Sequence, residues 1–550
     1  MNGGLAKYGR YLLAGASAIG LLTLGLPEAR AQNMQEIQAQ INQMQATIKA
    51  LQKQVEDAKA QAASAQTTAD SAKGSDLDLK VKWKGAPQLS SGDGKFSVKV
   101  RGRLETDYNH VNQDSGITSF PDVSATELRR ARMGVEGILF FDWKYVIEAD
   151  FANDSVRMKD AYLQYQGFKV YDEALLLRVG NFKTPNTFED ETSDRFVDTM
   201  ERAAFINAWD IERQIGFTTA YYAPHVNLAA GIFGERFPST ADAPLFPGFT
   251  GDEDTTFAAR AGWAPINRDI NGVTQVLHIG GSYRLRESGD DQPFFQYGPN
   301  AKGADLHMAN APITTGRIGD EDRFWGLEAA GLWGPFAIQG EYARLNVDLP
   351  DGSLIRSNPT GSTSTVPGKS INPFTGVPNP EYTGWYVEGS WFFGGHKTYE
   401  DEGTWGRPVV NHPMFHESGG WGALQIVGKY DVLDMSDSQN IVLAGFQGGD
   451  NLNFVGACAV TPLFPGNQTG NPTNGSKPAN VAECGDMKTW VVGVNWWMTP
   501  YMRIMFNYAQ SDLSGYSTTP ADLGNGLLEA KNGFDGATVR GFGTRFQVDW

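Results

Sequence analysis

Cations recur at every second residue in one short stretch of the sequence, FSVKVRGRLETDYNH at residues 96–110. Lys99, Arg101 and Arg103 form this row, and the residues between them are apolar or small. Successive side chains of a strand point to opposite faces, so a strand here has one apolar face and one basic face. Guanidinium groups are weakly hydrated and offer planar, bidentate donors to oxyanions. A row of them can therefore replace part of the water shell of a small anion.

The elements that position such a row are short alternating segments, which begin near residue 95 and continue to the end of the chain. The sequence predicts sixteen strands, near 96–108, 128–141, 143–152, 158–167, 173–182, 212–222, 226–234, 255–264, 275–286, 322–332, 335–345, 382–394, 421–433, 487–498, 501–512 and 537–550.

Short and long connectors largely alternate between these strands, except that the join at 395–420 is long where a short turn is expected. FFDW (140–143), YAPHV (222–226), WGP (333–335) and MTPY (498–501) are tight turns, whereas the connectors between them are long and polar. Short turns on one side and long loops on the other are typical of an outer-membrane β-barrel, in which apolar side chains face lipid and polar side chains face the lumen. Aromatic residues near the strand ends agree with this. In a soluble β-sandwich, the alternative, the apolar face would form a core instead.

The N-terminal residues carry an export signal. Lys7 and Arg10 precede an apolar run, and Ala29-Arg30-Ala31 follows it, so residues 1–31 are predicted to be a signal peptide; a membrane anchor is the alternative. Export leads to an oxidising compartment, where Cys458 and Cys484 are expected to form a disulfide.

A heptad pattern follows the signal. Apolar residues alternate three and four apart from Met34 to Ala58, and alanines continue the register, so residues 32–73 are predicted to form a trimeric coiled coil. A lone amphipathic helix packed on the body is the alternative. Residues 74–94 are polar and predicted to be a linker, and residues 95–550 are assigned to the barrel.

Composition restricts the function further. The formal net charge is −17, which argues against nucleic acid as a partner. The mean hydropathy is −0.36, too polar for a bundle of membrane helices. No HExxH, GxSxG or P-loop pattern and no metal-spaced Cys/His cluster occurs, so neither an enzyme nor a cofactor or metal is expected.

The alternating segments resemble the phosphate- and polyphosphate-selective porin family of Gram-negative outer membranes (the OprP/OprO type). The matching stretches are KVRGRLETDY (99–108), LRRARMGVEGILFFDWKY (128–145), LRVGNFKTPNTFEDETSDRFVDTMERA (177–203) and VGVNWWMTPYMRIMFNYA (492–509). The resemblance covers roughly residues 95–550. It implies a sixteen-stranded barrel that assembles as a homotrimer in outer-membrane lipid and a ladder of lumenal arginines that conducts small anions such as phosphate.

Several cations fall on the polar face and could form that ladder. The predicted anion pathway comprises Lys99, Arg101, Arg103, Arg130, Arg132, Arg284, Arg286, Arg503 and Arg545. For any one of them, a structural ion pair with a neighbouring carboxylate is the alternative. Glu328, Glu341 and Glu388 are also expected in the lumen.

The long loop 183–211 follows the fifth predicted strand. We expect it to fold into the lumen, where opposed charges would filter solutes. The predicted constriction residues are Lys183, Arg195, Arg202, Arg213, Glu189, Asp190 and Asp194. An outer loop held by its own ion pairs is the alternative.

The sequence therefore predicts an outer-membrane channel that passively conducts anions. Two alternatives remain: a barrel that anchors a coiled-coil tether, and a general porin without phosphate preference.

Overall fold

A computed structural model of the chain describes residues 42, 46, 48–50, 52–60, 79–83, 85–113, 122–152, 156–209, 211–234, 254–289, 295–298, 306, 313, 315, 317–348, 379–415, 419–438, 442–443, 455–456, 484–522, 528–531 and 537–550. The chain divides into two units, Met1–Asp78 and Leu79–Trp550. Within these residues, no helix combines the length and apolar character needed to cross a membrane.

The first unit is described only in part. Residues 42, 46, 48–50 and 52–60 are helical, within the segment predicted to be a coiled coil. Ile48 and Val55, both heptad positions, are 54% and 53% exposed. The predicted signal peptide 1–31 lies outside the described residues, and the coiled coil as an assembly of chains stays a prediction.

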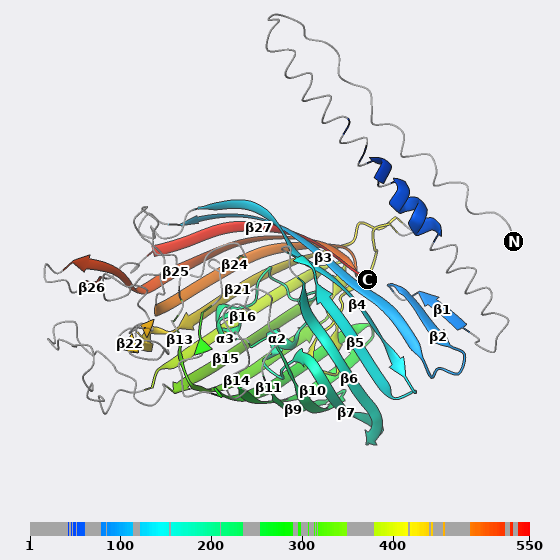
Figure 1. Cartoon of the computed structure of the whole chain (residues 1–550), viewed down its shortest axis with the longest axis horizontal. Helices are drawn as coiled ribbons and strands as arrows, with labels where there is room; N and C mark the ends of the chain where they lie inside the picture. The colour runs from blue at the N-terminus through cyan, green and yellow to red at the C-terminus, as the bar shows by residue number, and fades with distance from the viewer. Residues whose placement is uncertain are drawn as a thin grey trace, which may run out of the picture. The chain divides into compact units, whose positions relative to one another are not determined.

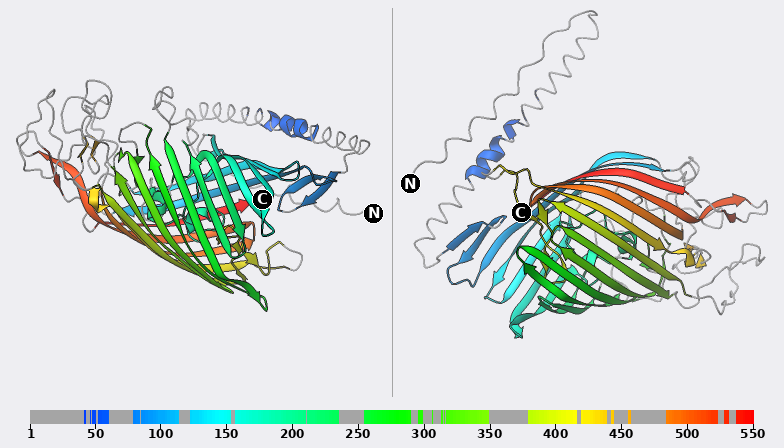
Figure 2. Two further views of the ribbon diagram at one scale, coloured as in Figure 1. Left: turned by 90° about the horizontal axis from the view of Figure 1, so that it is seen from below. Right: turned by 180° about the vertical axis from the view of Figure 1, so that it is seen from behind.

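The second unit contains a closed antiparallel barrel of sixteen strands (Figures 1 and 2). The last barrel strand, β27, pairs with the first, β3, and this closes the ring. The barrel strands are β3 (Ser97–Gln113), β4 (Val123–Leu139), β5 (Trp143–Asp150), β6 (Arg157–Val170), β7 (Glu173–Lys183), β8 (Arg213–Ala223), β9 (Val226–Phe233), β10 (Thr255–Ile270), β11 (Val273–Glu287), β14 (Glu321–Trp333), β15 (Phe336–Asp348), β16 (Glu381–Phe393), β21 (Ala423–Asp434), β24 (Cys484–Thr499), β25 (Met502–Asp522) and β27 (Ala537–Asp549). Every predicted strand has its counterpart here, so the predicted barrel is confirmed.

Alternation along the strands decides which face points inward. On β3, Val100 is 38% exposed on the outer face, whereas Arg103 is 6% exposed on the inner face. The polar row therefore faces the interior of the barrel, and the apolar row faces outward.

Turn geometry explains the short connectors. The four predicted tight turns are present, and two more join β6 to β7 and β10 to β11. Tyr171 and Asp172 in the first of these have φ of 49° and 72°, and Asn271 and Gly272 in the second have φ of 55° and 77°. Two consecutive residues with positive φ are the geometry of the two-residue hairpin turn that matches strand twist.

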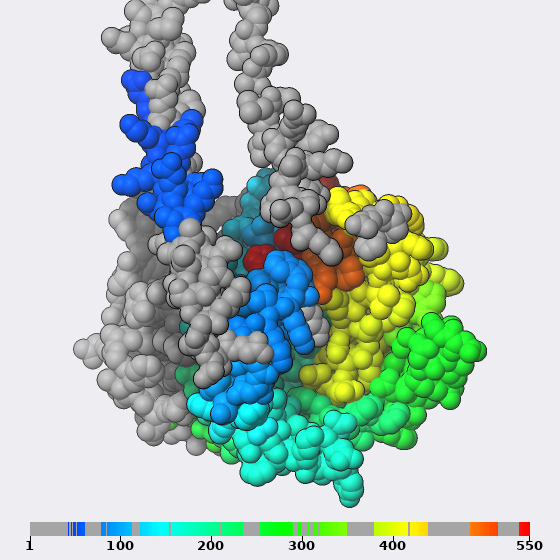
Figure 3. All heavy atoms as spheres, turned by 90° about the vertical axis from the view of Figure 1, so that its right-hand side faces the viewer, coloured from blue at the N-terminus to red at the C-terminus, as the bar shows by residue number. Residues whose placement is uncertain are grey.

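The predicted linker 74–94 contains a hairpin. β1 (Leu79–Trp83) pairs with β2 (Pro87–Ser91), and β2 pairs with the start of β3 at Ser97–Lys99. Figure 3 faces the end of the barrel at which this hairpin lies, coloured bright blue.

The remaining elements lie in the connectors. They are α2 (Phe188–Glu191), α3 (Ala204–Trp209), β12 (Phe295–Gln296), β13 (Arg317–Gly319), β17 (Gly395–His396), β18 (Tyr399–Glu400), β19 (Thr404–Trp405), β20 (Val409–Val410), η3 (Ser436–Ser438), β22 (Val442–Leu443), β23 (Val455–Gly456) and β26 (Leu528–Lys531).

The hydrophobic core of the second unit forms inside the barrel. Phe205 and Trp209 of α3 cluster with Leu306 of the β11–β14 connector and with inward residues of several strands, including Tyr386 of β16. Connector segments thus fill part of the lumen and narrow it.

Candidate anion pathway

The connector between β7 and β8, residues 184–212, lies inside the barrel and crosses the lumen; we refer to it as the inserted loop. Thr187 caps α2, which begins at Phe188. The backbone N–H groups of Phe188 and Glu189 donate to the carboxylate of Glu341 on β15, at 3.0 and 2.7 Å. These N–H groups have no partner within the helix, so Glu341 satisfies donors that would otherwise be buried and unpaired.

Carbonyl groups further along the inserted loop accept from cations. Arg503 of β25 donates to the Val197 carbonyl at 2.7 Å, and Arg545 of β27 donates to the Met200 carbonyl at 2.6 Å. Lys429 of β21 donates to the Glu201 carbonyl at 2.8 Å. Arg284 of β11 donates to the Trp209 carbonyl at 2.7 Å, so three of the predicted pathway residues hold the inserted loop by its backbone.

Four arginines converge on one carboxylate of the inserted loop, Asp194; we call this group the arginine nest. Guanidinium nitrogens of Arg103 and Arg130 lie 3.4 Å from Asp194 Oδ2, Arg132 lies at 3.7 Å, and Arg202 contacts Oδ1. Burial raises the pKa of Asp194, but the surrounding guanidinium groups outweigh burial and hold this pKa well below its usual range. Asp194 is thus an anion fixed among cations from two strands and its own loop.

Lys99, Arg101 and Arg545 also contact carboxylates. Lys99 lies 3.7 Å from Glu136, and Arg101 lies 3.2 Å from Glu136 and 2.9 Å from Glu148. Arg545 forms a two-point pair with Asp107, at 2.7 Å for each bond.

Arg284 and Arg286 both contact Asp322 of β14. Asp322 also accepts from the hydroxyl of Tyr297 at 3.0 Å, and Arg286 lies over the ring of Phe295 at 3.7 Å. Arg286 therefore holds the β11–β14 connector against the wall.

The predicted constriction residues lie on or beside the inserted loop. Lys183 pairs with Asp190 at 2.7 Å, and Arg202 contacts both Asp190 and Asp194. Glu189 accepts from the Ala203 backbone at 2.9 Å, across the loop. The other two cations face the wall: Arg213 pairs with Asp160 of β6 at 2.8 Å, and Arg195 lies 3.5 Å from Asp549 of β27.

A second inserted segment was not foreseen from the sequence. The described residues of 394–422, the join between β16 and β21, also contact the interior. Arg260 of β10 donates to the Gly403 carbonyl at 2.7 Å and pairs with Glu328 at 2.7 Å. Lys397 pairs with Asp198 of the inserted loop at 2.7 Å. We refer to 394–422 as the inserted join; its length was the only sequence signal that it is not an ordinary turn.

Arg178 of β7 is a lumenal cation of a different kind. Its Nε donates to Gln164 Oε1 at 2.9 Å, and its guanidinium lies 4.6 Å from the ring centre of Tyr162. Within the described residues, no carboxylate pairs with Arg178. Its neighbours Leu177 and Val179 lie in the apolar run LLLRV, which obscured the alternation.

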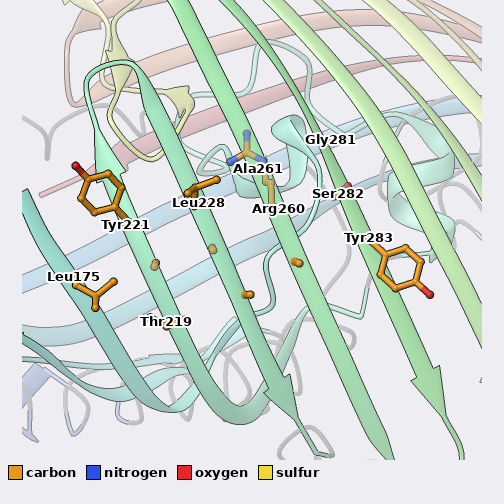
Figure 4. A pocket seen from close by; sticks show the side chains of 13 residues that line it. Leu175, Thr219, Tyr221, Leu228, Arg260, Ala261, Gly281, Ser282 and Tyr283 are labelled. Carbon is orange, nitrogen blue, oxygen red and sulfur yellow. The ribbon is translucent and has the colours of Figure 1, made fainter. Parts of the chain in front are cut away.

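A large hollow of about 630 Å³ lies elsewhere, on the outer face of β7–β11. Figure 4 shows Tyr221, Leu228 and Tyr283 on this face, whereas the Arg260 side chain leaves it in the other direction. The hollow is therefore not part of the pathway.

Comparison with known proteins identifies the family. Residues 98–538 match the sequence family described as phosphate-selective porin O and P. The chain belongs to this family. It is an outer-membrane porin, and the expected family is confirmed.

Two curated relatives are similar to this porin. An uncharacterised protein of Caulobacter vibrioides is 26% identical over 397 residues, which cover 71% of each chain. Porin O of Pseudomonas aeruginosa is 28% identical over 304 residues, which cover 50% of this chain and 65% of Porin O.

Solved structures give weaker matches. An anion-selective porin from Comamonas acidovorans has 11% identity and a TM-score of 0.43, with 83% of this chain and all of that chain covered (100%). An outer-membrane protein of Vibrio cholerae, OmpT, has 12% identity and a TM-score of 0.39, with 83% and 98% covered.

Proposed function

We propose that this porin preferentially conducts small anions, with phosphate as the first candidate solute. The observation that carries the proposal is the arginine nest, in which four guanidinium groups surround the carboxylate of Asp194. A carboxylate and a phosphate present similar oxygens to guanidinium donors, so a site that holds one has the donors to meet the other. The family description supports the same preference.

A continuous pathway also needs sites that release the ion. Lys99 and Arg101 lie beyond the nest on β3 and remain partly exposed, at 23% and 16% of the side chain. Arg178 donates to a glutamine instead of a carboxylate. Several modest sites in succession let an anion leave as readily as it enters.

Reversal potentials in a KCl gradient across a planar bilayer test the proposal. We expect the reversal potential to have the sign that a preference for chloride over potassium gives. We also expect phosphate to block part of the chloride current. The double variant Lys99→Gln with Arg101→Gln should reduce the anion preference. Lys488→Gln, an exposed cation on the outer face of β24, is the matched control and should change nothing. A wild-type channel without anion preference would contradict the proposal and favour a general porin.

We also propose that the mature protein is a homotrimer, carried to the outer membrane by the signal peptide 1–31. The exposed heptad residues Ile48 and Val55 support a coiled coil at 32–73, because apolar residues at these positions are normally buried between helices. We expect unheated protein to migrate as a trimer in mild detergent gels. A monodisperse monomer of the full chain would contradict this.

The disulfide between Cys458 and Cys484 stays a prediction as well, since Cys458 lies outside the described residues. Intact mass of outer-membrane preparations tests it: two free thiols would exclude the bridge.

A further inference from the structure

Asp549, the final residue of β27, lies between the two inserted segments. Its side chain faces inward and is 1% exposed. Oδ1 accepts from Arg407 Nη1 at 3.1 Å, and Oδ2 is in contact with Arg407 Nη2 and lies 3.5 Å from Arg195 Nη1. Arg407 belongs to the inserted join and Arg195 to the inserted loop. One carboxylate therefore bridges segments that enter the barrel from different connectors.

The neighbouring contacts show how closely the two segments approach at this point. The guanidinium of Arg407 lies 5.1 Å from the ring centre of Phe196, which follows Arg195 in the inserted loop. It also lies 4.1 Å from the ring centre of Tyr501, and it donates to the Pro500 carbonyl at 2.6 Å. Arg407 is thus held by the wall and by the inserted loop together.

The rest of β27 fastens the inserted loop only. Gln547 donates to the Arg195 carbonyl at 3.3 Å, and Arg545 donates to the Met200 carbonyl at 2.6 Å. These contacts would persist without the Asp549 carboxylate. The link between the two segments at β27 would not, because it consists of two cations that share one anion.

We propose that Asp549 is a positioning residue that fixes the inserted join against the inserted loop and so holds the constriction at one width. Without its negative charge, the guanidinium groups of Arg195 and Arg407, which are 23% and 25% exposed, would repel each other. The two segments would then separate and return by thermal motion beside β27, while the Lys397–Asp198 pair still joins them elsewhere. The proposal does not depend on which ion the channel prefers, since it concerns the steadiness of the opening.

Backbone contacts allow the carboxylate to be tested without opening the barrel. The Asp549 N–H donates to the Tyr501 carbonyl at 2.9 Å, and Asp549 pairs with Arg103 in the β27–β3 ladder. Neither needs the side chain. Asp549→Asn should therefore still fold, and the heat-dependent gel shift of folded barrels checks that it does.

Single-channel recording of the full-length protein in a planar bilayer gives the decisive measurement. We expect Asp549→Asn to raise the open-channel current noise several-fold, with brief transitions to other conductance levels. Asp549→Glu keeps the negative charge, so its current noise should be close to that of the wild type. Glu381→Gln is the matched control, because Glu381 contacts Arg344 on the outer face and touches neither segment.

A double variant distinguishes the bridge from a general loss of packing. Because both changes break one link, Asp549→Asn with Arg407→Gln should be no noisier than Asp549→Asn alone. A quiet Asp549→Asn channel, an equally noisy Glu381→Gln channel or additive noise in the double variant would each overturn the proposal. If Asp549→Asn does not fold, Arg195→Gln and Arg407→Gln replace it: noise in both supports the bridge, and quiet currents in both overturn it.

Discussion

Two walls of the lumen hold the inserted loop in opposite ways. The arginine wall consists of Arg103, Arg130, Arg132, Arg503 and Arg545 on β3, β4, β25 and β27. The carboxylate wall consists of Glu328, Glu341 and Glu388 on β14, β15 and β16. The first donates to carbonyl oxygens and to Asp194, whereas Glu341 on the second accepts the N–H groups at the start of α2.

The difference lies in what each wall can still bind. A carboxylate only accepts, so once Glu341 has taken two N–H groups and the Tyr386 hydroxyl at 2.8 Å, its oxygens are largely used. A guanidinium has five N–H donors, so it can hold the loop and a carboxylate at the same time. Arg503 and Arg545 are 0% and 1% exposed. An anion in the lumen should therefore meet the more exposed Lys99 and Arg101 at the end of the basic row.

The largest effect is expected when the arginine wall loses a buried member. Arg545→Gln leaves Asp107 buried without its cation, whereas Glu201 keeps Arg129 at 3.3 Å. Removal of one partner from a buried ion pair typically costs about 3–5 kcal/mol. Urea unfolding in detergent, followed by the gel shift, should show this loss. Retention of wild-type stability would mean that water reaches the Asp107 carboxylate.

A smaller effect, dependent on solute, is expected at the centre of the arginine nest. Asp194→Asn leaves the four guanidinium groups without their common anion, at a cost near the lower end of the same range, about 3 kcal/mol. Phosphate should restore part of this stability and chloride less. Thermal unfolding in matched buffers of equal ionic strength measures it, and equal recovery in both salts would argue against a phosphate site here.

The carboxylate wall should be less sensitive. Glu341→Gln keeps one acceptor oxygen but places an amide group near a backbone N–H, which leaves a buried donor unsatisfied at about 1–3 kcal/mol. We expect faster proteolysis of the inserted loop and a higher single-channel conductance. If both equal those of the wild type, Glu341 does not hold α2 in place.

The smallest effect on stability is expected at the exposed end of the arginine row. Lys99 and Glu136 are 3.7 Å apart and partly solvated, so Lys99→Gln should cost about 0–1 kcal/mol. Its effect should appear in the reversal potential instead. A large loss of stability would show that the Lys99–Glu136 pair supports the fold, as the Arg545–Asp107 pair is expected to do.

The barrel could be predicted because its signal is local. Alternation of apolar and polar residues over about ten positions marks each strand, because charged side chains are unfavourable on the lipid face of the barrel. Two turns were missed for different reasons. Tyr171-Asp172 contains neither glycine nor proline, and Asn271-Gly272 carries the usual hairpin signal but lies beyond the predicted strand end.

The partners of the lumenal cations could not be predicted in the same way. Asp194 follows Arg103 by 91 residues in sequence, and the sequence contains no local pattern that brings them together. The predicted basic row is therefore present, but most of its members hold the inserted loop or its neighbours. Arg178 was missed because it lies in an apolar run that hides the alternation of the strand. The inserted join was missed because its length departs from that of the other turns.

The pairing of β27 with β3 also bears on how the protein folds. Arg545 and Asp107 lie 438 residues apart in the chain and form a buried pair at the seam of the ring. Contacts between residues so far apart in the sequence form late in folding. The chain loses the entropy of the intervening loop before the contact provides any stabilisation. Until then β3 and β27 are free strand edges, the kind of surface on which chains aggregate. The chain should therefore need a chaperone or an assembly catalyst that shields both edges until they meet.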